Sequence, residues 1–108
     1  MEPRLERLLE RGASEVARKY GGVRALIICT MRGNILSVLL ADTGRIDTKS
    51  TWDLTEIINI SSSIGELLSR HGFAVRKVEL EVEDGLDYSR LYLNIYFYRK
   101  GEGDAGSR

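Results

Sequence analysis

The chain has 108 residues, 43% of them hydrophobic and 30% charged, which is typical of one globular domain with a single core. Sixteen basic residues balance sixteen acidic ones, so the chain lacks the positive field by which non-specific nucleic-acid binders gather phosphate. The single cysteine excludes an intramolecular disulfide, and every apolar run is far shorter than the roughly 20 residues that span a membrane. We therefore expect a cytoplasmic domain with no membrane span, for which nucleic acid is an unlikely partner.

The first predicted element is an amphipathic helix that starts at Pro3, a residue suited to the first turn of a helix. Apolar or small residues recur at steps of three and four up to Tyr20, on a segment otherwise rich in Arg and Glu. Gly21 and Gly22 are expected to end this helix.

Two apolar runs of strand length follow, at residues 23–31 and 35–41, separated by Arg32, Gly33 and Asn34. Gly and Asn adopt the positive φ of tight turns, so the runs are predicted to form a β-hairpin. Both runs are apolar at nearly every position, which predicts central strands or strands covered by another subunit.

A polar segment, residues 42–53, is predicted to be a surface loop. Asp53 with Glu56 is expected to cap a second helix that ends at His71, and Ser50 or Thr51 are alternative starts. Its sheet-facing stripe includes Leu54, Ile57 and Leu68, and mid-helix Gly65 suggests a close approach to the sheet. A second apolar stripe on this helix has two interpretations, a wide core-facing arc or a dimer interface. It consists of Ile60, Ile64, Leu67 and His71.

Residues 75–83 and 90–98 alternate between apolar and polar positions, which predicts a second hairpin with one apolar face. The polar face would carry Tyr92, Tyr96 and Tyr98, opposite three glutamates of the preceding strand. Residues 101–108 hold no large apolar side chain and are expected to be a disordered tail after a single domain, residues 1–100. The prediction is an α+β fold in the order α-β-β-α-β-β, with an antiparallel sheet of four to five strands packed by two helices in two or three layers.

The chemistry-bearing residues are sparse, so we expect neither an enzyme nor a metal or cofactor site. The alternative of a small enzyme of unknown substrate would need a cofactor or substrate that supplies the missing chemistry. His71 reads as a helix cap and Cys29 as a small buried hydrophobe, while Asp42, Asp47 and Asp53 match no calcium loop. No glycine cluster opens a helix as phosphate-binding motifs require. The tyrosine face could bind single-stranded RNA, although glutamates across the hairpin would repel phosphate. The absence of Gln beside abundant Glu, Arg and Lys hints at a thermophilic source.

The pattern from Leu5 to Phe97 resembles the roadblock/dynein light chain family of small longin-like and profilin-like domains. The matching features are the amphipathic first helix, the hairpin at residues 25–36 with Gly33 in its turn, and the long second helix. Members commonly have a fifth strand and a third helix, for which this chain shows no counterpart. The resemblance implies a non-enzymatic homodimer or heterodimer, paired through its long helix and an edge strand, that regulates a small Ras-like GTPase or a motor complex.

Overall fold

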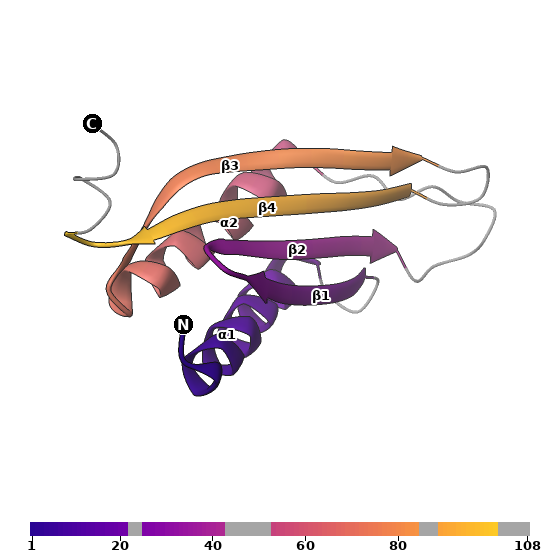
Figure 1. Ribbon diagram of the computed structural model, residues 1–108. Helices are drawn as coiled ribbons and strands as arrows, with labels where there is room; N and C mark the ends of the chain where they lie inside the picture. Colours follow the sequence, from indigo (N-terminus) through magenta and orange to yellow (C-terminus); the bar gives the residue numbers. More distant parts are fainter. Residues whose placement is uncertain (22–24, 43–52, 85–88, 102–108) are drawn as a thin grey trace.

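The computed structural model describes residues 1–21, 25–42, 53–84 and 89–101. The elements occur in the predicted order: α1 (Pro3–Gly21), β1 (Ala25–Arg32), β2 (Ile35–Asp42), α2 (Leu54–Arg70), β3 (Phe73–Asp84) and β4 (Ser89–Arg99) (Figure 1). The α+β prediction is therefore confirmed. The expected loop at residues 42–53 and the tail at residues 101–108 lie almost wholly outside the described residues.

The four strands form one antiparallel sheet in the order β1-β2-β4-β3. Each hairpin contributes its second strand to the centre of the sheet, where β2 pairs with β4. The turn between β1 and β2 places Gly33 at φ 59°, the left-handed conformation that favours glycine. The chain thus consists of two α-β-β units joined side by side through their inner strands.

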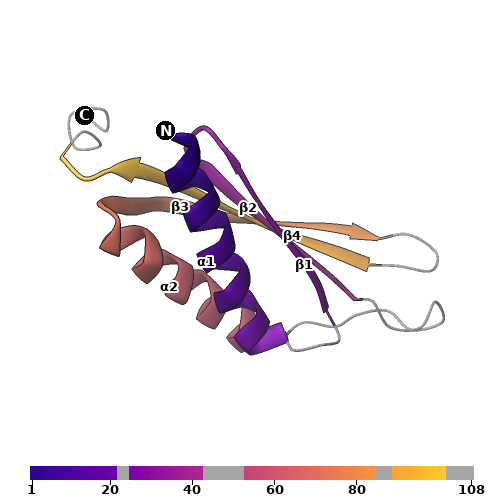
Figure 2. The same cartoon turned by 90° about the horizontal axis from the view of Figure 1, so that it is seen from below.

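Both helices cover the same face of the sheet and leave the other face open, as Figure 2 shows. The layering is therefore two layers, with four strands in the part of the chain that the structure describes. The core lies between the layers and is built from the helix-facing residues of every strand and the inner faces of both helices. Its fully buried large side chains include Leu9, Leu36, Leu40, Ile60, Ile64, Leu93 and Phe97.

Of the two alternatives for the first hairpin, a central position holds for β2 but not for β1, for which cover by another subunit stays a prediction. β1 lies at one edge of the sheet, and Ile28 on its open face is 47% exposed. Uniform apolarity does not separate a strand buried on both faces from an edge strand with one solvated apolar residue. β1 pairs with β2 alone, in a register that places Ile28 opposite Leu39.

Candidate functional site

The outer edge of β3 combines an unpaired strand with a row of exposed apolar side chains. β3 is the last strand of the sheet, so its outer edge has no neighbouring strand among the described residues. Val78, Leu80 and Val82 point to the helix side, opposite Ile95, Leu93 and Leu91 of β4. They are 43%, 47% and 62% exposed, whereas their partners on β4 are buried. We call these three residues the β3 apolar row.

The β3 apolar row is exposed because the helices stop short of it. α2 lies over the beginning of β3, where Phe73 is buried and Val75 approaches Gly65. Farther along, the C-terminal part of β3 and the N-terminal part of β4, which pair with each other, extend beyond both helices (Figure 2). Leu54 and Ile58, in the N-terminal half of α2, are also more than half exposed. The helix layer therefore leaves apolar surface uncovered on this part of the chain.

The opposite edge of the sheet, formed by β1, differs from the β3 edge. The backbone N–H of Met31, on the edge strand β1, donates to the Glu10 carboxylate of α1 at 2.8 Å. A carboxylate at this position occupies a donor that a strand from another molecule would need. One edge of the sheet is thus blocked by a side chain of α1, and the β3 edge has no such block among the described residues.

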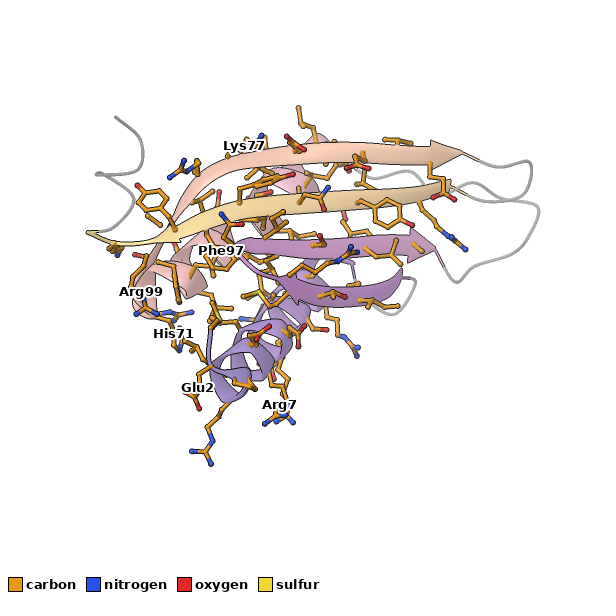
Figure 3. All side chains as sticks on the ribbon, in the orientation of Figure 1. Glu2, Arg7, His71, Lys77, Phe97 and Arg99 are labelled. Carbon is orange, nitrogen blue, oxygen red and sulfur yellow. The ribbon has the colours of Figure 1, made fainter. Side chains whose placement is uncertain are left out.

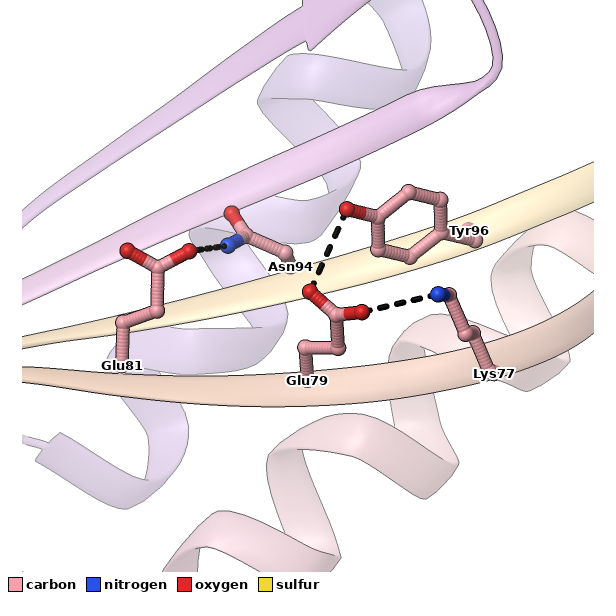
Figure 4. A network of polar contacts seen from close by, with 5 residues as sticks. All are labelled: Lys77, Glu79, Glu81, Asn94 and Tyr96. Carbon is pink, nitrogen blue, oxygen red and sulfur yellow. Dashed lines mark hydrogen bonds and ion pairs between the residues drawn. The ribbon is translucent and has the colours of Figure 1, made fainter.

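The open face of the sheet carries a network of polar side chains across β2, β4 and β3. Ser37 donates to Asn94 at 2.8 Å, and the Asn94 amide donates to Glu81 at 2.9 Å. Beside them, the Tyr96 hydroxyl donates to Glu79 at 3.3 Å, as Figure 4 shows, and the Tyr92 hydroxyl donates to Glu83 at 3.4 Å. Tyr92 and Tyr96 of this face are therefore held by carboxylates.

Cations complete this network. Lys77 forms an ion pair with Glu79 at 2.8 Å and lies 4.5 Å from the centre of the Tyr96 ring (Figure 4). The hydrogen bond from Lys77 lowers the pKa of Glu79, and the same bond raises the pKa of Lys77. Arg76 lies over the ring of Tyr98 at 5.2 Å. Because Glu79 pairs with Lys77 and Glu83 pairs with Arg90, while Glu81 accepts from the Asn94 amide, the face resembles a solvated surface more than a ligand site.

The predicted second stripe of α2 is placed mainly in the core. Ile60 and Ile64 are fully buried and Leu67 is 8% exposed, so within one chain these residues follow the first interpretation, a wide core-facing arc. The physical reason is that α1 packs against α2 on one side while the sheet packs on another, so both stripes are covered within one chain. The helix cap His71 alone remains partly exposed. The prediction of a dimer stays open, on a different surface.

His71 has the capping role expected of it, while Cys29, expected to be buried, is only partly buried against the core. The backbone N–H of His71 donates to Leu68 O at 3.0 Å, and its Nδ1 lies 2.9 Å from Leu67 O, which makes it a C-terminal cap of α2. At the other end of α2, Asp53 is the N-cap and its N–H points to the Glu56 carboxylate at 3.5 Å. Burial, reinforced by Glu10, raises the pKa of the Cys29 thiol to about 12.

Comparison with known proteins does not assign the chain to a family. No family model, no curated protein and no solved structure matches it. The fold is consistent with the expected roadblock-like arrangement, an α-β-β-α-β-β chain with four antiparallel strands. No helix in the described ranges has the length and apolarity needed to cross a membrane.

The sequence predicts Val78, Leu80 and Val82 on the apolar face of the second hairpin, and it does not predict that they are exposed. The alternation along β3 contains no information on how far the helix layer extends. In the structure β3 has 12 residues and α2 has 17, so at about 3.3 Å and 1.5 Å per residue the strand is the longer element. The predicted strand, residues 75–83, is shorter than β3, so this difference in length was hidden at the level of the sequence.

Proposed function

We propose that this protein is a non-enzymatic interaction domain that forms a homodimer by pairing the outer edge of β3 with β3 of a second copy. The observation that carries the proposal is the β3 apolar row on an unblocked edge. Long edge strands with exposed apolar side chains associate readily, and soluble monomers avoid them. Antiparallel pairing would extend the four-stranded sheet across the dimer.

The sequence of β3 suits such self-pairing. In an antiparallel pair centred on Leu80, Val78 of one copy faces Val82 of the other, and the two Leu80 side chains meet at the two-fold axis. The apolar row is then covered by its own counterpart. On the polar face Lys77 stands opposite Glu83 of the other copy, which contributes an attractive pair at each end of the contact. Glu79 faces Glu81 in this register, so the polar face also holds repulsive pairs, and Lys77 lies beside Glu79 in each copy.

The resemblance to the roadblock family supports a class of partner for this dimer. We propose that the dimer serves as a platform or regulator for a small Ras-like GTPase. Co-elution of the purified dimer with candidate GTPases, loaded with GDP or with a non-hydrolysable GTP analogue, tests this extension. The alternative, binding of single-stranded RNA by Tyr92, Tyr96 and Tyr98, is disfavoured because carboxylates accept hydrogen bonds from Tyr92 and Tyr96.

The dimer itself is tested by light scattering behind a sizing column at tens of micromolar protein. Leu80→Lys places a charge at the centre of the proposed contact and is expected to shift the population to monomer. Ile28→Lys is the matched control, because Ile28 has the same 47% exposure but lies on the open face of the other edge strand. A wild-type monomer, or a dimer that survives Leu80→Lys and is lost in Ile28→Lys, contradicts the proposal.

A further inference from the structure

A second surface, separate from the β3 edge, lies along α1 and the C-terminal end of α2. It is a groove of about 610 Å³ lined mainly by basic and apolar side chains, among them Arg4, Arg7, Leu8, Arg11, Leu67 and His71. Figure 3 shows Arg7 projecting outward from α1 and His71 at the end of α2, on the same side of the molecule. Glu15, at one end of the groove, is its one acidic lining residue.

The three arginines of the groove form a row on one helix. Arg4, Arg7 and Arg11 follow each other at steps of three and four, which brings them to one side of α1. None of them makes a hydrogen bond, an ion pair or a ring contact with another described residue. Like charges at this spacing destabilise a helix, so an anionic occupant would relieve a repulsion that the chain alone leaves in place.

The centre of the groove is apolar. Leu8 is 47% exposed between the arginines, and the floor is formed where Leu67 packs against the backbone of Gly12. An apolar centre with a charged rim is the usual anatomy of a protein-binding surface. Arginine also pairs with carboxylates through two parallel hydrogen bonds, which gives such a rim geometric specificity.

We propose that this groove binds an acidic amphipathic segment of a partner protein. One apolar side chain of the segment would contact Leu8 and Leu67, and carboxylates on either side of it would pair with Arg4, Arg7 and Arg11. A second copy of the chain does not fit, because two such grooves would bring six arginines together against two Glu15 side chains. A nucleic acid fits less well, since it offers no apolar side chain for Leu8 and the chain has no net positive charge.

The test uses fluorescence anisotropy with a labelled peptide about three helical turns long, with leucines on one face and glutamates on the other. A scrambled peptide of equal composition and an oligothymidylate of equal charge are the comparison probes. The amphipathic peptide is expected to bind most tightly. Arg7→Ala with Arg11→Ala is expected to weaken it about tenfold, since two charge pairs are lost, and Leu8→Ser is expected to weaken it as well.

Arg32→Ala with Arg76→Ala is the matched control, because it also removes two exposed arginines but takes them from the strands and away from the groove. It is expected to leave peptide affinity unchanged. The proposal would be overturned if the two double variants lost equal peptide affinity or if Leu8→Ser had no effect on it. Equally tight binding of oligothymidylate would overturn it as well. Leu80→Lys is expected to leave peptide binding intact, so the outcome is independent of the dimer.

Discussion

Gly12 of α1 lies against the side chain of Leu67 of α2 so closely that a Cβ built at position 12 would stand 2.8 Å from Leu67 Cδ2. The absence of a side chain at position 12 therefore sets how closely the two helices approach. Sequence reasoning placed the close approach at Gly65 instead, where a Cβ would meet Val75 at an ordinary 3.6 Å.

Gly12→Val is expected to destabilise the protein by about 1–3 kcal/mol, because a branched side chain forces α1 and α2 apart. Guanidinium denaturation followed by circular dichroism measures the change. Gly12→Ala is the milder control, in which the gain in helix propensity partly offsets the displacement of the Leu67 methyl groups. An unchanged midpoint for the Val variant would show that the helices do not pack at this distance.

Gly65→Ala is expected to stabilise the fold by about 0.5–1 kcal/mol. The added methyl group meets only an ordinary contact with Val75, and replacing a mid-helix glycine reduces the entropy of the unfolded chain. The same denaturation measurement checks it. A loss of stability would mean that α2 lies nearer to β3 than the 3.6 Å contact indicates.

Leu67→Glu is expected to destabilise the folded monomer by several kcal/mol, because it introduces a charge at a buried position beside Gly12. Ile58→Glu, at a half-exposed position of the same helix, is the control and should cost little. Thermal melting with light scattering separates unfolding from dissociation. If the Leu67→Glu protein melts normally but is monomeric, the dimer interface lies on the predicted stripe of α2 and not on β3.

Glu10→Ala is expected to cost about 1–3 kcal/mol, because the Met31 N–H loses its acceptor at a partly buried position. Amide hydrogen exchange at Met31 should accelerate at the same time. Glu15→Ala removes an exposed carboxylate from the same helix and should leave both readouts unchanged. If Glu15→Ala has the larger effect, general helix electrostatics, and not the Met31 bond, is responsible.

Cys29 is expected to react slowly with alkylating reagents while the protein is folded. Its pKa of about 12 leaves almost no thiolate at pH 8.5, so the rate should rise by roughly three orders of magnitude on unfolding. Because the folded pKa exceeds the unfolded one, stability should also fall as pH rises from about 9 towards 12. Cys29→Val removes that contribution. Rapid labelling of native protein at pH 8.5 would contradict the burial of this thiol.

The type of each element, and which side chains of β4 point to the core, could be predicted because the periodicity of a segment depends only on its own residues. Asp53, His71 and the Gly33 turn follow from capping and turn preferences. The strand order and the coverage of β3 could not be predicted, because they depend on where α1 and α2 lie over the sheet. The stripe of Ile60, Ile64 and Leu67 fits a core or an interface equally well until the position of α1 is known.

The pairing of β2 with β4 has a consequence for the folding reaction. Each hairpin joins residues close in sequence, but β2 and β4 bring together Leu36 and Ile95, 59 positions apart. Closing such a long loop costs chain entropy before the contacts between β2 and β4 form and offset that cost. The two α-β-β units are therefore expected to gain structure locally, and the slow step is their docking along this seam. Substitutions at the seam, such as Val38→Ala, should slow folding more than equal truncations at the ends of the hairpins.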